Sequence, residues 1–291
     1  EFRGYIKVMN YSIILYIVGK VMMLESACFL IPAVTSLIYG EHEGMAYLIV
    51  GAVSAIIGYL ISSKKKFENV FFAREGFVMV ALSWIVLSVV GAIPFVLTGE
   101  IPNMVDALFE TVSGFTTTGA SILEDVESLS HTSLIWRSFT HWVGGMGVIV
   151  LLLAILPMAG GYNMHLMKAE SPGPVVGKLV PRLRDTAKIL YLIYLVMTVI
   201  EFVILLFVKM PVFDALCITF GTAGTGGFGI KADSLGSYSY AIQVVVTVFM
   251  ILFGVNFNAY FLLLGKHKKD AFKIEAVSYT HLRAHETVLD L

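Results

Sequence analysis

The stretch Asp106-Ala107-Leu108 returns as Asp214-Ala215-Leu216, 108 positions further along the chain. At the same offset Gly119 corresponds to Gly227, and a Gly/Thr-rich stretch precedes each of these glycines. Long apolar segments flank both copies. Three shared residues could arise by chance, but shared glycines and shared flanking segments at one offset indicate an internal repeat. We therefore expect each repeat to consist of a span, a short helix, a Gly/Thr loop and a second span.

The composition places these repeats in a membrane. Of the 291 residues, 57% are hydrophobic and only 14% are charged, whereas ordinary soluble domains have about 25% charged residues. The mean hydropathy is +0.84. A net charge of −1 without a dominant basic block excludes a nucleic-acid partner. Cys28 and Cys217 lie in apolar stretches and cannot form a disulfide framework or a four-ligand zinc site. The sequence therefore predicts an all-α polytopic membrane protein.

Six segments approach the roughly 20 apolar residues that a helix needs to cross a bilayer. They are Val21–Tyr39, Met45–Ile61, Phe77–Leu97, Leu134–Leu156, Ile189–Val208 and Ala241–Leu264. The short stretch before them, Asn10–Gly19, is expected at the membrane interface. With both termini in the cytosol, sixteen Lys and Arg residues fall on cytosolic loops and three, Arg137, Lys209 and Lys231, fall outside. Because cytosolic loops are enriched in Lys and Arg, we expect this orientation.

Between the third and fourth spans, and again between the fifth and sixth, lies a segment too long for a turn and too short to cross. These segments are Met104–Ser121 and Val212–Ile230, and each short helix follows a proline, Pro102 or Pro211. Non-helical backbone at membrane depth is tolerated only where protein buries it or where it lines a watery cavity. We therefore expect each segment to enter from outside and return. The partially negative C-terminal end of its helix then favours a cation near the membrane centre.

The two loops that follow these short helices are the candidate ion-binding sites. Glycine permits backbone angles that turn carbonyl oxygens towards an axis, and such oxygens can replace the hydration shell of an alkali cation. A single Gly/Thr loop is usually an ordinary connector, but a repeated pair between spans favours ion binding. No Walker A, HExxH or Rossmann motif competes. The residues whose backbone would bind the ion are Thr116, Thr117, Thr118, Gly119, Gly224, Thr225, Gly226 and Gly227.

Several polar residues outside the loops also need an explanation. Glu201 lies inside the fifth span, where a charge is costly, and we interpret it as structurally paired rather than as part of a conduction pathway. Arg137, near the outer end of the fourth span, could hydrogen-bond the back of one of the two Gly/Thr loops. We interpret His141 as a packing residue and Glu25 as a side chain that snorkels to the inner surface.

Ten acidic residues expected on the outer side are either simply tolerated there or raise the cation concentration at a pore mouth: Glu41, Glu43, Glu100, Asp106, Glu110, Glu124, Asp125, Glu127, Asp214 and Asp233.

The loops and the helix that follows the first of them resemble a known family. Thr116-Thr117-Thr118-Gly119-Ala120 is followed by Trp136-Arg137 and by His141-Trp142-Val143-Gly144-Gly145-Met146-Gly147. Together with Thr225-Gly226-Gly227-Phe228 and Asn256-Phe257-Asn258, these motifs resemble the Trk/Ktr potassium-uptake superfamily, and most closely its TrkH/TrkG branch. The similarity extends from about residue 9 to about residue 275 and includes an amino-terminal lead-in hairpin.

The resemblance implies a potassium pore built from four pseudo-symmetric repeats behind a lead-in helical hairpin. This chain has the hairpin and two repeats, each a span, pore helix, filter loop and span, which corresponds to half of a four-repeat pore. We expect this half to be inactive alone. The resemblance further implies potassium uptake rather than enzymatic activity, K+ as the transported ion at the filter residues, and no covalently bound cofactor. It also implies a homodimer, a cytosolic TrkA-like nucleotide-binding regulatory subunit, and the bilayer of a bacterial cytoplasmic membrane.

Three alternatives stay open beside this interpretation. The first is a KtrB-like subunit whose potassium uptake is coupled to sodium, although the lead-in hairpin argues against it. The second is a membrane enzyme that uses His131, His141 or Glu201, although these residues form no paired catalytic constellation in the sequence. The third is a membrane scaffold that transports nothing.

The expected organisation has six parts, two of them at the ends of the chain. Val277–Thr287 resembles a translated transposase sequencing adapter, and the first methionine is Met9. The six parts are a non-native leader at 1–8, the helical hairpin at 9–72, the first pore repeat at 73–160, a basic cytosolic loop at 161–187, the second pore repeat at 188–276, and an adapter-like tail at 277–291.

Overall fold

The computed structural model describes residues 9–63, 73–147, 183–255 and 257–264. Within these ranges the chain is all-helical and contains no strand, which confirms the predicted fold class. The helices are α1 Tyr11–Cys28, α2 Leu30–Tyr39, α3 Gly44–Ser63, α4 Ala73–Thr98, α5 Met104–Phe115, α6 His131–Gly145, α9 Leu183–Phe207, α10 Val212–Ala223, α11 Tyr240–Gly254 and α12 Phe257–Leu264. The basic loop and the tail predicted at the sequence level lie outside the described residues, apart from the first turn of α9.

The first span begins earlier than the sequence suggested. α1 and α2 together form one apolar helical segment of 29 residues, Tyr11–Tyr39, so the prediction of an interfacial Asn10–Gly19 was wrong. The reason is a close approach between α1 and α3. The position that a Cβ would occupy on Gly19 lies 2.7 Å from the carbonyl oxygen of Gly58. Small residues allow such backbone contact between helices in a membrane, and this contact keeps the early turns of α1 in the bundle.

Four helical segments are long and apolar enough to cross a bilayer. They are Tyr11–Tyr39, Gly44–Ser63, Glu75–Thr98 and Lys188–Phe207. The predicted span Leu134–Leu156 is described only up to residue 147. The helix α6 has 15 residues, begins just before this span at His131 and ends within it at Gly145. The predicted span Ala241–Leu264 is not one helix: α11 ends at Gly254, and Val255 has the extended angles φ −68° and ψ 137°. A break of this kind removes backbone hydrogen bonds and divides the segment.

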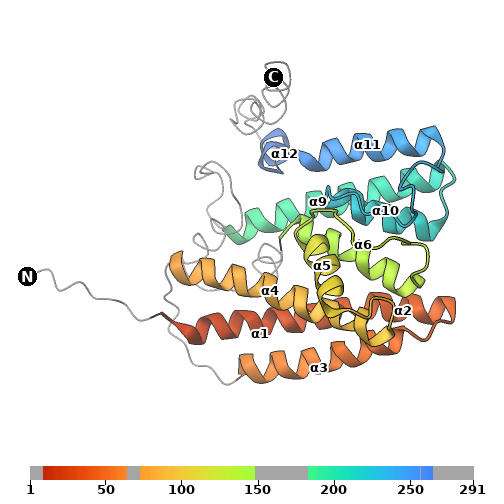
Figure 1. Ribbon diagram of the computed structural model, residues 1–291. Helices are drawn as coiled ribbons and strands as arrows, with labels where there is room; N and C mark the ends of the chain where they lie inside the picture. The colour runs from red at the N-terminus through yellow and green to blue at the C-terminus, as the bar shows by residue number, and fades with distance from the viewer. Residues whose placement is uncertain (1–8, 64–72, 148–182, 256, 265–291) are drawn as a thin grey trace, which may run out of the picture.

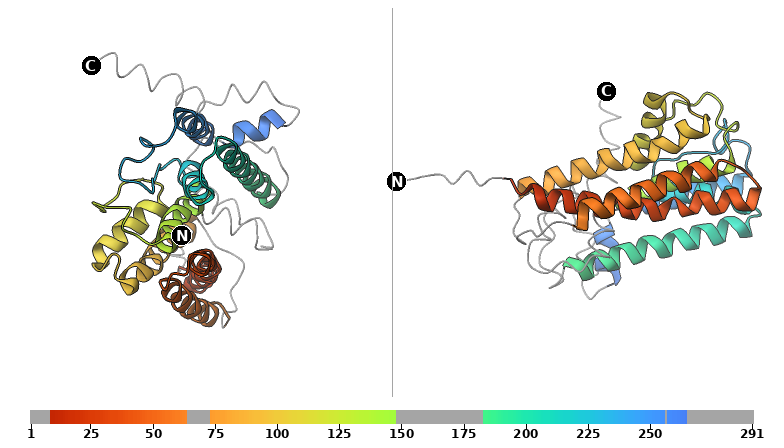
Figure 2. Two further views of the ribbon diagram at one scale, coloured as in Figure 1. Left: turned by 90° about the vertical axis from the view of Figure 1, so that its right-hand side faces the viewer. Right: turned by 90° about the horizontal axis from the view of Figure 1, so that it is seen from below.

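The long helices run side by side, and the short helices lie among them (Figure 1). The ends of α2, α4 and α9 lie at one end of the bundle, and the beginnings of α1, α4 and α9 lie at the other end (Figure 1). These helices therefore cross the bundle in the same direction, as alternate crossings of a chain must. The end-on view in Figure 2 separates the hairpin from α9 and α11. Between these two groups α6 packs against both short helices, α5 and α10. This central position makes α6 the helix that holds the two repeats together.

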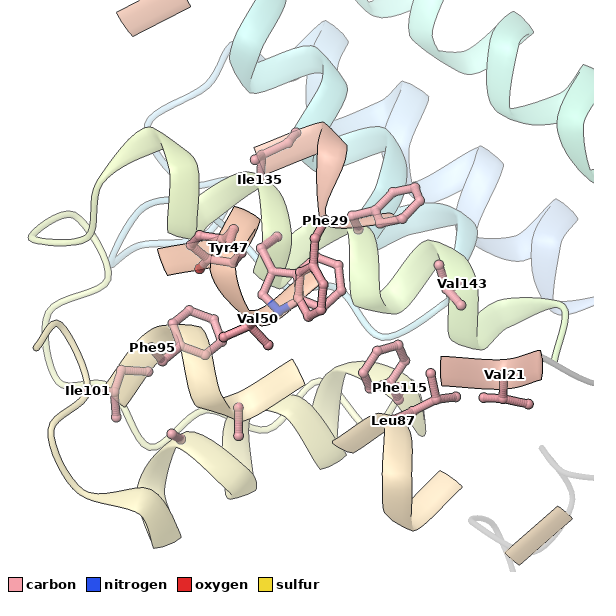
Figure 3. Close-up of a cluster of buried hydrophobic side chains, with 14 of the residues drawn as sticks. Val21, Phe29, Tyr47, Val50, Leu87, Phe95, Ile101, Phe115, Ile135 and Val143 are labelled. Atoms are coloured by element: carbon pink, nitrogen blue, oxygen red, sulfur yellow. The ribbon is translucent and has the colours of Figure 1, made fainter. Parts of the chain in front are cut away.

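The core beneath the first short helix is aromatic. Phe29 and Tyr47 from the hairpin and Phe115 from the end of α5 point into one cluster (Figure 3). Trp136 of α6 lies in the same cluster, with its ring 4.5 Å from that of Phe29, and its indole nitrogen donates a hydrogen bond of 3.0 Å to the carbonyl of Gly91. Close packing, rather than exclusion of water, drives helix association in a bilayer. The hairpin is therefore packed directly against the back of the first repeat.

Candidate functional site

The two short helices are equal in length and in position within their repeats. α5 and α10 each have 12 residues, and their ends differ by the offset of 108 seen in the sequence. The side chain of Asn103 caps α5 by accepting a hydrogen bond from the Val105 amide at 2.9 Å. At α10 the equivalent cap is Pro211, which makes no such bond. Both helices end inside the bundle at a Gly/Thr loop, which confirms the predicted repeat.

The two loops have the same backbone conformation. Thr117 and Thr225 have φ values of 55° and 57°, and Gly119 and Gly227 have φ values of 76° and 75°. Positive φ is uncommon for a residue with a side chain, so its occurrence at equivalent threonines reflects a shared constraint. Every second residue is left-handed in each loop, and a backbone of alternating hand can turn successive carbonyl oxygens to one side.

The loop amides and carbonyls are used differently. The amides of Thr116 and Gly224 donate to Val112 and Phe220, at 2.9 Å and 3.3 Å, so each loop is bound to the last turn of its own helix. Among the described residues, no hydrogen bond ends on a carbonyl oxygen of residues 116–119 or 224–227. The described residues also contain no cluster of His, Cys, Asp or Glu able to hold a metal ion. The carbonyl oxygens of both loops are thus left without hydrogen-bond donors from the described part of the chain.

The loops touch each other at their glycines. A Cβ on Gly119, which has φ +76°, would overlap the carbonyl oxygen of Gly226. A Cβ on Gly226 would in turn overlap the imidazole ring of His141. Glycine is thus required at both positions, because the neighbour at the first is backbone and the neighbour at the second is a fully buried ring. The eight loop residues predicted from the sequence are brought together at one place.

His141 forms part of the wall behind the second loop. Its ring is buried and stacks on that of Phe228, with centroids 3.9 Å apart and planes inclined by 11°. Backbone groups of Ser113 and Gly221, which are equivalent residues of the two repeats, approach this ring. Neither ring nitrogen has a partner with hydrogen-bonding geometry among the described residues. The packing role predicted for His141 agrees with this arrangement.

Arg137 and Glu110 lie on the same side of the loops as His141. The Arg137 side chain donates a hydrogen bond of 2.8 Å from Nη1 to the carbonyl of Gly229, directly after the second loop. Its Nε lies 3.5 Å from a carboxylate oxygen of Glu110. The sequence placed Glu110 among the acids on the outer side, and the structure shows in addition that the residue is buried, with 1% of its surface exposed. It lies on the inner face of α5, which α6 covers, and sequence position alone did not reveal that cover.

Two other outer acids serve as caps of α6 rather than as free charges. Glu41 accepts hydrogen bonds from the backbone amides of His131 and Thr132, both at 2.9 Å. Glu100 accepts one of 2.6 Å from the amide of Ser130. Burial alone would raise the pKa of Glu41, but the hydrogen bonds from Thr132 and His131 outweigh burial and lower its pKa. The hairpin is thereby tied to the start of the helix behind the loops.

The two carboxylates inside the spans are both buried. Glu201 is 0% exposed and lies beside Thr222 in the last turn of α10. Its oxygens have no hydrogen-bond partner of good geometry among the described residues. Glu25 is 2% exposed and lies against Gly91 on α4, so the expectation that it snorkels to the surface was wrong. α1 starts before Lys20, and Glu25 therefore lies deeper than the sequence indicated.

Long apolar helices that enclose two short helices, whose glycine loops touch each other, define a class: polytopic membrane proteins with a repeated short helix and loop between spans. Residues 43–284 match the TrkH family, described as cation transport proteins. The chain belongs to this family.

The relatives agree with that assignment along most of this chain. It is 40% identical over 262 residues to "Trk system potassium uptake protein TrkH" of Salmonella typhimurium, covering 88% of this chain and 54% of the relative. It is 34% identical over 258 residues to "Trk system potassium uptake protein TrkG" of Escherichia coli, covering 87% and 53%. The crystal structure of the potassium transporter TrkH from Vibrio parahaemolyticus superposes with a TM-score of 0.76 at 32% identity, covering 91% of this chain and 55% of that one. The chain spans about half the length of the curated relatives it matches.

Proposed function

We propose that this chain forms the amino-terminal half of a potassium-uptake subunit, in which the backbone of the two Gly/Thr loops binds the transported ion. The observation that carries the proposal is the geometry of the loops. They share left-handed residues at equivalent positions, touch at Gly119 and Gly226, and have carbonyl oxygens free of hydrogen bonds from the described residues. Backbone oxygens arranged around an axis can replace the water shell of an alkali cation.

Potassium, rather than another cation, is proposed from the relatives, which are named as potassium uptake proteins. The eight filter residues are proposed to act through their carbonyls, and the threonine side chains are not required as ligands. Arg137 is proposed to support the second loop, since it donates to Gly229. Glu201 is proposed to support the end of α10, since it lies beside Thr222.

Transport by this half alone is not expected. Two loops supply carbonyls around only part of the circumference of an ion, and a dehydrated cation with an incomplete shell is strongly disfavoured. The proposed complete subunit has four repeats, pairs with a second copy and binds a cytosolic TrkA-like nucleotide-binding protein. Both termini of the present segment are proposed to lie in the cytosol, on the strength of the distribution of Lys and Arg.

The test compares two proteins in bacteria that lack potassium uptake. One is residues 1–291, and the other joins residues 1–276 to the carboxy-terminal half of the Salmonella relative. We expect the joined protein to take up rubidium and to support growth on low potassium, and residues 1–291 to insert without doing so. Membrane insertion is verified by fractionation. A joined protein that inserts but takes up no more rubidium than an empty vector would overturn the proposal.

The same experiment separates the alternatives. A KtrB-like subunit would require sodium for rubidium uptake, and we expect uptake here to persist when sodium is replaced by choline. A scaffold or a membrane enzyme would give no uptake in any salt. Growth supported by residues 1–291, and lost with Gly119→Ser, would show that two repeats suffice.

A further inference from the structure

A buried ion pair lies behind both loops. Glu110 belongs to α5 and Arg137 to α6, and their side chains are 0% and 3% exposed. The distance from Nε of Arg137 to Oε2 of Glu110 is 3.5 Å. Burying two charges is costly, and apolar residues of similar volume often stabilise a fold as well as a buried pair does. Fold stability alone therefore does not explain the presence of these charges.

Each member of the pair reaches a different loop. Glu110 accepts hydrogen bonds from the Ser121 hydroxyl and, at 3.2 Å, from the Ile122 amide, directly after the first loop. Arg137 donates to the carbonyl of Gly229, directly after the second loop, at 2.8 Å. Ser121 and Gly229 are equivalent residues of the two repeats, 108 positions apart. The pair thus joins the same point of both loops through one continuous set of polar contacts.

Arg137 makes a second contact with the second loop. Its guanidinium carbon lies 3.6 Å from the centre of the Phe228 ring. A planar guanidinium can stack on a ring, pair with a carboxylate and donate to a carbonyl at the same time, and a lysine cannot. The geometry therefore uses properties that only arginine has.

Within the described ranges this pair occurs once, although the helices that carry it occur twice. Glu110 and Arg137 are the seventh residues of α5 and α6, and the seventh residues of α10 and α11 are Ile218 and Val246. These two apolar residues are buried in one cluster. The chain therefore already contains an apolar form of the same position in a folded repeat.

We propose that Glu110 and Arg137 are positioning residues that fix the spacing between the two filter loops and thereby the preference for potassium over sodium. The proposal rests on the proposed function, because it assumes that the loop carbonyls bind the ion. The distance between opposing carbonyls affects which cation replaces its water shell most readily. With the pair removed, α5 and α6 still pack, but the exits of the two loops are no longer joined.

The first test measures loop spacing in residues 1–291 and needs no transport. Spin labels are placed at Glu124→Cys and Ala232→Cys, which are exposed equivalent positions after the two loops, with Cys28 and Cys217 replaced by alanine. The test variant is Glu110→Leu with Arg137→Met. The matched control is Ile218→Leu with Val246→Met in the second repeat. We expect the distance distribution to broaden about twofold in the test variant and to stay unchanged in the control, with helical content retained in both.

The second test measures ion preference in the joined protein. We expect the preference of uptake for potassium over sodium to fall about tenfold in the Glu110→Leu, Arg137→Met variant. A tenfold change corresponds to about the free energy of one charge-assisted hydrogen bond. Arg137→Lys keeps the charge and should give an intermediate loss.

A folded test variant with unchanged distance width and unchanged preference overturns the proposal. If the double variant fails to fold, Arg137→Lys decides by the same two measurements. If the unaltered joined protein transports no potassium, the proposed function fails, and the spin-label widths still decide whether the pair positions the loops.

Discussion

The first and second repeats share the backbone conformation of their short helices and loops but differ in the side chains that lie behind the loops. Both have a short helix of 12 residues, two left-handed loop residues and a following helix of 15 described residues. At the same three positions of the following helix, the first repeat has Trp136, Arg137 and His141, and the second has Val245, Val246 and Met250. The helix α6 is covered by α5 on one side and α10 on the other, whereas α11 packs against α9 and α10.

This difference separates two kinds of requirement. The conformation of a loop depends on its own residues, so both repeats have threonine at the first left-handed position and glycine at the second. A buried polar side chain is costly unless neighbours satisfy it, and on α6 the side chains of Trp136 and Arg137 donate to the carbonyls of Gly91 and Gly229. The polar scaffold is therefore concentrated on the helix that both repeats share. Three of the four following predictions compare equivalent positions or equivalent helix ends, and the other one concerns the carboxylate that caps α6.

The largest effect is expected at the loop glycines. Gly119→Ala should abolish rubidium uptake by the joined protein, since its Cβ would overlap the carbonyl oxygen of Gly226 in addition to straining φ. Gly227→Ala should reduce uptake less, because its Cβ would meet only the flexible end of Met250 at 3.3 Å. Thr116→Ser, which leaves the backbone unaltered, is the control. Equal loss at both glycines would show that φ strain dominates and that the contact between loops is unimportant.

The next effect concerns the packing behind each loop. Trp136→Ala should destabilise residues 1–291 by about 3–5 kcal/mol, the usual range for deleting a buried aromatic side chain. The ring contacts Phe29 and donates to the Gly91 carbonyl, so the hairpin loses its anchor as well. Val245→Ala at the equivalent position of the half-buried α11 should cost less. Thermal unfolding in detergent measures both, and a larger loss at Val245 would contradict the packing account.

A smaller effect is expected from the carboxylate that caps α6. Glu41→Gln should cost about 1 kcal/mol, since two backbone amides and the Thr132 hydroxyl lose a charged acceptor. The pKa of Glu41 is lowered in the folded protein, so its contribution is present above the ordinary glutamate pKa of about 4.3. That contribution is lost as the pH falls through the lowered value. Melting temperatures of the unaltered and Gln proteins should therefore converge at acidic pH, and a constant difference would contradict the assignment.

The smallest effect compares the two helix caps. The Ser130 side chain accepts a hydrogen bond of 3.2 Å from the Ser133 amide, whereas Ser239 makes no such bond at α11. Ser130→Ala should cost about 1 kcal/mol, and Ser239→Ala should be close to neutral. The same thermal measurement detects the difference. Equal costs would mean that the caps are alike in the membrane-embedded protein.

Much of the fold could be predicted from the sequence, because its signals are local or periodic. Apolar length indicated the helical spans, and the 108-residue offset indicated the repeat. The extent of the first span was wrong, since the approach of Gly19 to Gly58 depends on a helix more than 30 residues away. The snorkelling position assigned to Glu25 was also wrong, and the burial of Glu110 was not predicted, because burial depends on which helices cover a face.

The sequence by itself determined the class of protein, the two repeats and the identity of the loop residues. These follow from side-chain hydropathy and from the backbone angles that glycine allows, which are properties of single residues and short stretches. Only the tertiary structure decided that Glu110 meets Arg137 and that Arg137 reaches Gly229, 92 positions away. Such contacts depend on which helices become neighbours. A charged residue within an apolar segment indicates that it needs a polar partner, but the sequence does not identify that partner.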